Sequence, residues 1–267
     1  MKKRGLILFP HPATDRNNAY PQWRDAARKA GAEVEIAFFG DALPRVDFAV
    51  VRGYDASLSA RLESEGCRVF NRAEAMELSR DKRLTYSRLR ECGVSTPECV
   101  WDVPFEAAAA TLGVPFVTKA ACGSCGRNVF LTHDAGEYAR ALSECGAEGA
   151  LSQRYLAASH GRDLRVWTVG DRAVACVMRR SDGALQSNYT MGGHAYGHTL
   201  DEKAARLAVA AAQSIGLDFA GVDLLIDGEG GYTVCEVNGN AGFRTLYAVQ
   251  PDNDLLKQLM EWILKKL

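Results

Sequence analysis

The sequence predicts an α/β protein made of α+β lobes. Apolar runs alternate with helical stretches along the first part of the chain, as in a parallel sheet with crossover helices. Two later pairs of apolar runs are separated by glycine-containing turns, which predicts β-hairpins. Hydrophobic residues make up 47% and charged residues 24% of the 267 residues, so the chain can bury a large core.

The first region, residues 1–79, consists of alternating strands and helices. In chain order the expected elements are a strand at Gly5–Pro10, a helix at Ala19–Ala30, strands at Glu33–Phe39 and Asp47–Val51, a helix at Ala56–Glu65 and a strand at Arg68–Phe70. Both helices stop before a glycine, which is a common C-terminal signal. We therefore expect a leading lobe built on a parallel sheet.

The central region, residues 80–157, contains a glycine-rich flap. Its expected helices are Asp81–Cys92 and Ala107–Leu112, and a strand opens at Pro97. A strand over Val114–Lys119 then enters the small-residue segment Ala120–Gly126, and a second strand, Val129–Leu131, leaves it. No Gly-Lys-Ser/Thr sequence follows and no helix opens there, so the pattern predicts a hairpin flap and not a P-loop.

The last region, residues 158–267, predicts two hairpins and two helices. The hairpin strands are Leu164–Val169 with Arg172–Val177, and Gly221–Ile226 with Tyr232–Val237. Thr199-x-x-Glu202 has the form of a capping box, so we expect Thr199 to cap a helix that ends at Ile215. A final helix is expected over Asp254–Leu264.

The second hairpin carries acidic and amide side chains inside apolar strands. Glu236 and Asn238 share one face of their strand because side chains alternate. With a four-residue connecting loop, Asp223 lies directly opposite Glu236, at about 5 Å. Such acids are costly to bury unless they are paired or bound to metal. Two carboxylates and an amide oxygen suit a hard cation such as magnesium. The alternative is that each acid simply faces solvent.

Basic residues lie on the same elements and could receive a polyphosphate. Lys82 opens a helix and Lys119 ends the strand before the flap, while Arg165, Arg179 and Arg180 lie on the first hairpin. A triphosphate needs several cations in addition to magnesium. Each of these residues taken alone is also compatible with a solvated surface charge. Lys119 is the exception, since apolar and small residues flank it on both sides.

Several segments, in this order, resemble ATP-grasp ligases of the RimK-like (glutamate ligase) group. They are Ser79–Lys82, Pro115–Lys119 with the flap, Leu151–Leu156, Gly161–Arg165, Arg179-Arg180, Ser187-Asn188 with Gly192-Gly193, Ala220–Asp223 and Cys235–Asn238. The resemblance covers the chain from about Arg80 to its end. It implies an ATP-grasp fold, with residues 1–79 as the lobe that precedes it.

The resemblance also implies roles for individual residues. Lys82 and Lys119 would contact the ATP phosphates, and Asp163 would bind the ribose. The hinge under the adenine would be formed by Gln153, Arg154, Tyr155 and Leu156. The γ-phosphate and acyl-phosphate would be steadied by Arg165 with Arg179 or Arg180, and Asn188 would act on the acceptor side. Magnesium, with manganese as the substitute, would be held by Asp223, Glu236 and Asn238.

The function implied is that of an ADP-forming carboxylate–amine ligase that works through an acyl-phosphate. Its partners would be an amino acid such as glutamate and a small-molecule, cofactor or peptide acceptor. Two alternatives stay open: an ATP-grasp kinase for small molecules, and a nucleotide-binding module without turnover. The segment after the acidic strand, Gly239–Leu246, lacks the proline that relatives often have. Arg244 within it is either a ligand for a substrate carboxylate or a surface charge.

Charge and cysteine usage limit the other possibilities. The formal net charge of −1 gives no basic field for nucleic acid or an anionic membrane. No apolar stretch approaches the roughly 20 residues of a membrane span, so we expect a cytoplasmic protein, assembled as a homodimer or homotetramer if it follows its relatives. The 8 cysteines fit free thiols in a reducing compartment. Cys122 and Cys125 are either small flap residues or a redox pair.

Overall fold

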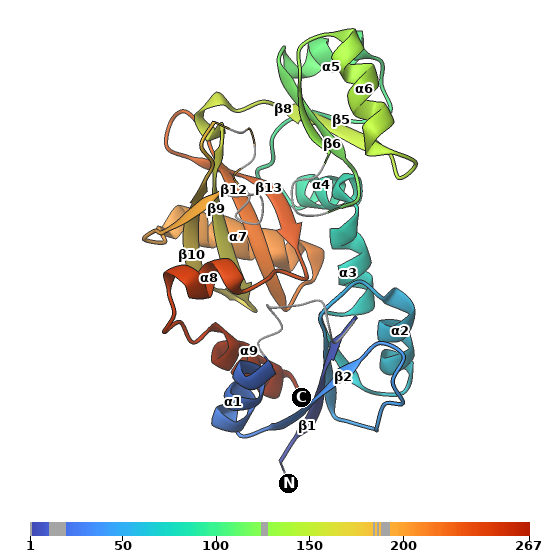
Figure 1. Ribbon diagram of the computed structural model, residues 1–267, viewed down its shortest axis with the longest axis vertical. Helices are drawn as coiled ribbons and strands as arrows, with labels where there is room; N and C mark the ends of the chain where they lie inside the picture. The colour runs from blue at the N-terminus through green and yellow to red at the C-terminus, as the bar shows by residue number, and fades with distance from the viewer. Residues whose placement is uncertain (1, 11–19, 124–127, 184, 186, 188–192) are drawn as a thin grey trace.

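Three β-sheets follow one another along the chain in the computed structural model (Figure 1). The structure describes residues 2–10, 20–123, 128–183, 185, 187 and 193–267. Each of the three expected regions contains one of the sheets.

The N-terminal sheet is parallel, in the strand order β2-β1-β3-β4. Its strands are β1 (Arg4–Phe9), β2 (Glu33–Phe38), β3 (Phe48–Val51) and β4 (Arg68–Phe70). The helices of this part of the chain are α1 (Tyr20–Ala30), α2 (Ala56–Ser64) and α3 (Ala73–Arg80). The expected parallel sheet with crossover helices is therefore confirmed.

The central sheet is antiparallel, in the order β5-β8-β6-β7. Its strands are β5 (Cys99–Val100), β6 (Phe116–Ala120), β7 (Val129–Thr132) and β8 (Ala150–Arg154). The neighbouring helices are α4 (Lys82–Glu91), α5 (Phe105–Leu112) and α6 (Ala135–Cys145). Helices α5 and α6 pack on this sheet through Leu112, Phe116 and Tyr138, while α4 packs against the C-terminal sheet and its helix. Strands β6 and β7 pair as the expected hairpin, and residues 124–126 of the expected flap lie outside the described residues.

The C-terminal sheet is antiparallel and has the order β11-β10-β9-β12-β13. Its strands are β9 (Arg162–Val169), β10 (Arg172–Arg180), β11 (His194–Gly197), β12 (Phe219–Ile226) and β13 (Tyr232–Asn238). The turn η1 (Ala157–Ser159) precedes it, and its helices are α7 (Glu202–Ile215), α8 (Arg244–Val249) and α9 (Leu255–Lys266).

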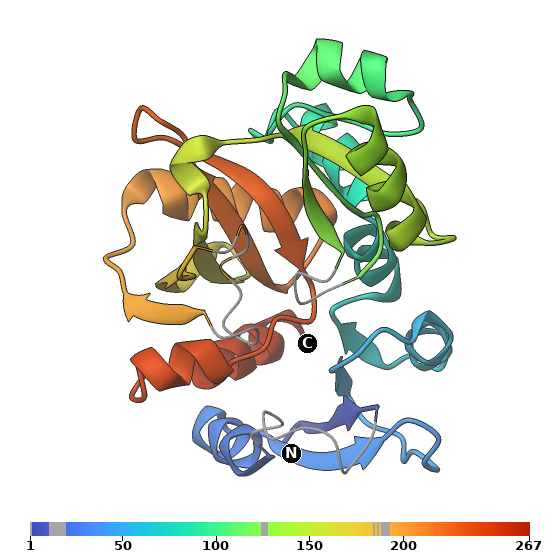
Figure 2. The same ribbon diagram turned by 45° about the horizontal axis from the view of Figure 1, so that its top comes forward.

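The two faces of the C-terminal sheet bury different partners. Alanines of α7 pack on one face, against residues such as Leu164 and Val222. The other face joins a core that also contains Trp23 of α1 and Leu259 of α9. Helices α8 and α9 thus lie between the C-terminal sheet and the N-terminal lobe (Figure 2). This shared core fixes the N-terminal lobe beside the last strands of the chain.

Some details differ from the sequence expectations. The capping box at Thr199 is wrong, because Asp201 is the N-cap of α7 and its carboxylate accepts a hydrogen bond from the Ala204 N–H at 2.9 Å. The Asp201 carboxylate immediately precedes the helix and accepts from an amide in its first turn. The helix therefore begins at Glu202, two residues later than it would with Thr199 as its N-cap. The sequence patterns also missed α3, α6, α8, β8 and β11.

No helix in the described parts of the chain is long and apolar enough to cross a membrane. The cysteines in those parts, at 67, 92, 99, 122, 145, 176 and 235, are all free thiols. Cys125 lies outside the described residues, so the question of a redox pair with Cys122 is untouched.

Candidate functional site

A pocket lies between the central sheet and the C-terminal sheet. Its empty volume is about 900 Å³, part of it open to solvent. Apolar side chains line one part, among them Val117, Val129, Leu156 and Leu225. Charged side chains line the rest: Lys82, Lys119, Arg162, Asp163, Arg179, Asp223 and Glu236. An apolar section beside a dense set of charges suits a ligand with a flat base and an ionic tail.

The two acidic strands pair as expected, although by a different route. Asp223 lies directly opposite Glu236 in the register of β12 and β13. The hairpin loop is five residues long and not four, and a β-bulge between Asp223 and Leu224 restores the pairing. The extra residue on β13 is Cys235. Cys235 and Glu236 therefore both line the pocket although they are consecutive in a strand.

Asp223 is the centre of a buried ion-pair network. Its carboxylate accepts hydrogen bonds from both Nε and Nη2 of Arg165, the latter at 2.7 Å, and forms an ion pair with Arg179 Nη2 at 2.9 Å. Arg179 also donates two hydrogen bonds to Asp163, at 2.7 and 2.6 Å. Burial alone raises the pKa of Asp223, but the guanidiniums of Arg165 and Arg179 outweigh it and hold that pKa below its usual value. The carboxylate is therefore ionised at neutral pH.

Lys119 is buried beside uncharged partners. Its Nζ lies 3.4 Å from Tyr86 Oη, 3.4 Å from the Cys235 carbonyl oxygen and 3.7 Å from Cys235 Sγ. Among the residues that the structure describes, no carboxylate forms an ion pair with this ammonium. A buried ammonium without a counter-ion is costly. Its position in the pocket wall therefore favours an anionic ligand.

Lys82 reaches the same end of the pocket from the start of α4. Its Nζ lies 3.4 Å from Glu236 Oε1 and donates to the Gly123 carbonyl at 3.0 Å. The backbone N–H of Lys82 donates to the Ala121 carbonyl at 2.9 Å, so the helix start is tied to the flap. The capping carboxylate of Asp81, which accepts from Arg83 N at 2.8 Å, fixes this end of α4.

The residues predicted to hold a metal have a suitable donor set. Asp223, Glu236 and Asn238 lie on one face of the β12–β13 hairpin. The Asn238 amide nitrogen is buried and has no hydrogen-bond partner in the described structure, so the amide can turn its oxygen toward a cation without losing a bond. The described residues contain no cluster of three or more His, Cys, Asp or Glu side chains for a metal. Two carboxylates and one amide oxygen match the ligands of a hard cation, although a cation at Asp223 would share that carboxylate with Arg165 and Arg179.

Most of the predicted site residues lie together. Lys82, Lys119, Gln153, Tyr155, Leu156, Asp163, Arg179, Asp223 and Glu236 line the pocket. Arg165 and Asn238 lie next to these residues, through the ion pair with Asp223 and the strand face of Glu236.

Three other predicted residues do not line the pocket. Arg154 is exposed and donates to the Thr111 carbonyl at 3.1 Å. Arg180 is exposed and borders a separate hollow beside η1. Arg244 is exposed at the start of α8. Asn188 lies outside the described residues.

The sequence patterns missed Tyr86 and Cys235. Tyr86 is fully buried, and its hydroxyl lies 2.9 Å from both Gln153 Oε1 and the Cys235 carbonyl. One signal was available, because Tyr86 follows Lys82 by four residues and so lies on the same helix face. For Cys235 no local signal existed, since the bulge that turns it toward the pocket depends on the loop length of the hairpin.

The chain is similar to known proteins over most of its length. Residues 102–263 match the family profile of the RimK-like ATP-grasp domain. The chain is 36% identical to beta-citrylglutamate synthase B of Homo sapiens over 71% of this chain and 51% of that protein. It is 30% identical to the probable alpha-L-glutamate ligase 2 of Hahella chejuensis, over 89% of this chain and 79% of that one. The chain thus spans about half the length of the human synthase.

A solved structure supports the same fold. The RimK domain ATP-grasp protein of Sphaerobacter thermophilus superposes with a TM-score of 0.74 at 21% identity, over 97% of this chain and 98% of that chain.

Proposed function

Because the chain belongs to the RimK-like ATP-grasp family, we propose that it is an ADP-forming carboxylate–amine ligase. Proteins of this family bind ATP and a divalent metal. The names of the relatives, a citrylglutamate synthase and a glutamate ligase, indicate that the amino acid joined is glutamate or one like it. The acceptor would be a small molecule, a cofactor or a peptide.

The observation that carries the proposal is the arrangement of charges around one pocket. Lys119 is buried and has no carboxylate partner among the described residues, and Asp223 and Glu236 lie opposite each other in the adjoining hairpin. The Lys119 ammonium suits a phosphate, and the two carboxylates suit a divalent cation that neutralises part of the phosphate charge. The apolar section beside the Gln153–Leu156 strand end suits an adenine ring.

We assign the residues accordingly. Lys82 and Lys119 bind the phosphates, and Arg165 and Arg179 stabilise charge on the transferred phosphoryl group. Asp163 accepts a hydrogen bond from Arg179 and lines the pocket. We therefore assign it to binding the ribose or to orienting Arg179. Magnesium, or manganese in its place, is held by Asp223, Glu236 and Asn238, and when bound it neutralises phosphate charge. We also propose 1–79, 80–157 and 158–267 as the three lobes.

The reaction needs no nucleophilic side chain. A substrate carboxylate oxygen attacks the γ-phosphorus and ADP leaves. The acyl carbon of the resulting acyl-phosphate then carries phosphate as its leaving group, in place of oxide or hydroxide. The amine nitrogen then attacks the acyl carbon, the C–N bond forms, and phosphate departs as nitrogen loses its proton. The protein's contribution is to orient the reactants and neutralise their charge. The flap, whose residues Ala120, Cys122 and Gly123 line the pocket, would exclude water from the acyl-phosphate.

The test is nucleotide turnover with pooled substrates. The protein is incubated with ATP, magnesium and pooled carboxylates, with and without pooled amino acids, and ADP and phosphate are measured. We expect ADP formation that depends on the amino acids and disappears in Glu236→Ala. Glu229→Ala is the matched control, because Glu229 is an exposed acid in the turn of the same hairpin.

The other outcomes separate the alternatives. ADP formation that is unaffected by amines would refute the ligase and favour a small-molecule kinase. Binding of ATP without turnover on any pool would favour a nucleotide-binding module.

A further inference from the structure

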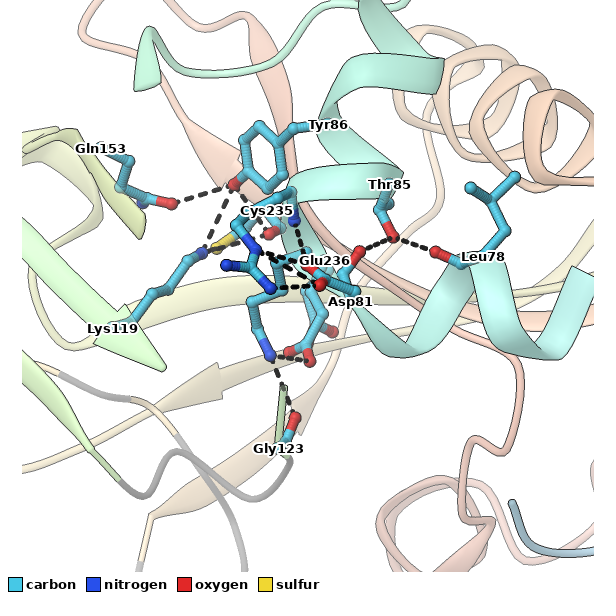
Figure 3. Close-up of polar contacts among 12 residues, drawn as sticks. Leu78, Asp81, Thr85, Tyr86, Lys119, Gly123, Gln153, Cys235 and Glu236 are labelled. Atoms are coloured by element: carbon cyan, nitrogen blue, oxygen red, sulfur yellow. Dashed lines mark hydrogen bonds and ion pairs between the residues drawn. The ribbon is translucent and has the colours of Figure 1, made fainter. Parts of the chain in front are cut away.

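The hydroxyl of Tyr86 joins three segments that meet at the pocket. Tyr86 lies on α4 and is 1% exposed. Its oxygen is 2.9 Å from Gln153 Oε1 on β8 and 2.9 Å from the Cys235 carbonyl on β13. Figure 3 shows this oxygen between Gln153, Cys235 and Lys119. One side chain therefore connects the central sheet with the C-terminal sheet.

The ammonium of Lys119 completes this contact set. It donates toward the Tyr86 oxygen at 3.4 Å and lies 5.4 Å from the centre of the same ring. A phenol oxygen has one proton and two lone pairs. The proton goes to one of the two acceptors at 2.9 Å, and a lone pair faces the ammonium. Burial raises the pKa of Tyr86 well above its ordinary value, so the group stays a neutral donor at physiological pH.

A lysine ammonium on a flexible four-carbon stem has no fixed place of its own. For Lys119 the recorded partners are the Tyr86 hydroxyl, the Tyr86 ring and the Cys235 carbonyl and thiol. We propose that Tyr86 is a positioning residue, whose hydroxyl and ring hold the Lys119 ammonium where it meets the phosphates of the nucleotide. This rests on the nucleotide site of the proposed function and adds a residue that the site assignment did not contain.

A second buried tyrosine shows what a purely structural role looks like. Tyr138 on α6 is also buried, and its hydroxyl donates to one backbone carbonyl, that of Val103, at 3.0 Å. A single acceptor satisfies such a hydroxyl. Tyr86 has two acceptors and a cation within reach, which is more than packing requires.

The predicted effect of Tyr86→Phe is specific to phosphate. The substitution keeps the ring and removes the oxygen that faces the ammonium. Hydrogen bonds to charged groups are strong enough that affinity for a non-hydrolysable ATP analogue should fall about ten-fold. Affinity for adenosine, which has no phosphate, should stay within about two-fold of the wild type.

The experiment measures binding of both ligands by calorimetry to the intact wild type, Tyr86→Phe, Lys119→Met and the double variant. Tyr138→Phe is the control and should bind both ligands like the wild type. If Tyr86 acts through Lys119, the double variant should bind the ATP analogue no more weakly than Lys119→Met alone. Equal loss of adenosine affinity in Tyr86→Phe, or fully additive losses in the double variant, would overturn the proposal.

Two further observations keep the outcomes distinct. A wild type that binds neither ligand contradicts the proposed function itself, whereas a wild type that binds while Tyr86→Phe is unchanged contradicts only the positioning role. If Tyr86→Phe does not fold, a crystal structure of the wild type with the ATP analogue decides. The Tyr86 oxygen must then lie in contact with Lys119 while Lys119 contacts a phosphate, and separation of the two side chains refutes the idea.

Discussion

Replacing Asp223 with Asn tests how the buried charges of the pocket are balanced. The change keeps the side-chain volume and removes the negative charge that Arg165 and Arg179 share. Arg179 keeps Asp163, but Arg165 loses the carboxylate that it grips with two donors. Breaking a buried ion pair from one side costs 3–5 kcal/mol, and the remaining amide oxygen places this case at about 3 kcal/mol. At about 2–4 °C per kcal/mol, the melting temperature should fall by about 6–12 °C.

The assay is thermal unfolding by circular dichroism or calorimetry, with Asp25→Asn as the control. Asp25 also pairs with two cations, Arg28 and Lys29, but on the surface of α1. Exposed pairs contribute little, so the control should melt with the wild type. Adding Arg165→Met to Asp223→Asn should recover part of the loss, because it removes the unpaired guanidinium. If Asp223→Asn melts within about 2 °C of the wild type, the argument about charge balance is wrong.

Three further predictions follow from single contacts. The pKa of Asp223 is lower in the folded than in the unfolded chain, so the stability gap between the wild type and Asp223→Asn should be constant above about pH 5 and shrink as pH falls below about 4, measured by denaturant titration. A Cβ at Gly221 would lie 2.5 Å from the Ala241 Cβ and 3.2 Å from Arg165 Cδ, so Gly221→Ala should cost about 1–3 kcal/mol in the same titration. The Asn71 amide accepts from the Phe219 N–H at 2.9 Å and donates to the Phe219 and Gly239 carbonyls at 2.7 and 2.9 Å. Asn71→Ala should therefore lower the free energy of unfolding by about 3 kcal/mol or more, and an unchanged denaturation midpoint would refute this stabilising role.

The hairpin of the acidic residues shows how far the sequence could go. Alternation along a strand places Glu236 and Asn238 on one face whatever the fold does around them. The residue opposite Glu236 depends on the length of the hairpin loop and on bulges in its strands. The loop is one residue longer than the sequence argument assumed, and the bulge at Cys235 compensates for that extra residue. The predicted pairing with Asp223 was therefore correct for an incomplete reason.

The arginine pair shows where sequence reasoning stops. Arg179 and Arg180 are consecutive in β10, so they point to opposite faces, and only the register decides which one enters the pocket. The register pairs Arg179 with Asp163 and leaves Arg180 exposed opposite Arg162. Tyr86 presents the same limit, since its contacts on β8 and β13 are 67 and 149 residues away in the chain.

The charges on the pocket imply that its ligand arrives with a cation. Five cationic side chains, Lys82, Lys119, Arg162, Arg165 and Arg179, lie on the described pocket wall or its ion-pair network. Three carboxylates, Asp163, Asp223 and Glu236, oppose them, which leaves an excess of two positive charges.

That excess is smaller than a nucleotide triphosphate requires. A terminal phosphate alone carries about −1.5 to −2 at neutral pH, and the inner phosphoryl groups and a substrate carboxylate add to it. Arg165 and Arg179 pair with Asp223, and Lys82 pairs with Glu236, so part of their positive charge is balanced before a phosphate binds. Among the described pocket cations, Lys119 and Arg162 have printed partners that carry no charge, so a phosphate could meet either of them without first displacing a carboxylate. On the proposed function, a divalent cation held by Asp223 and Glu236 would neutralise the remaining phosphate charge, and Lys82 would then be free to leave Glu236 for the phosphates.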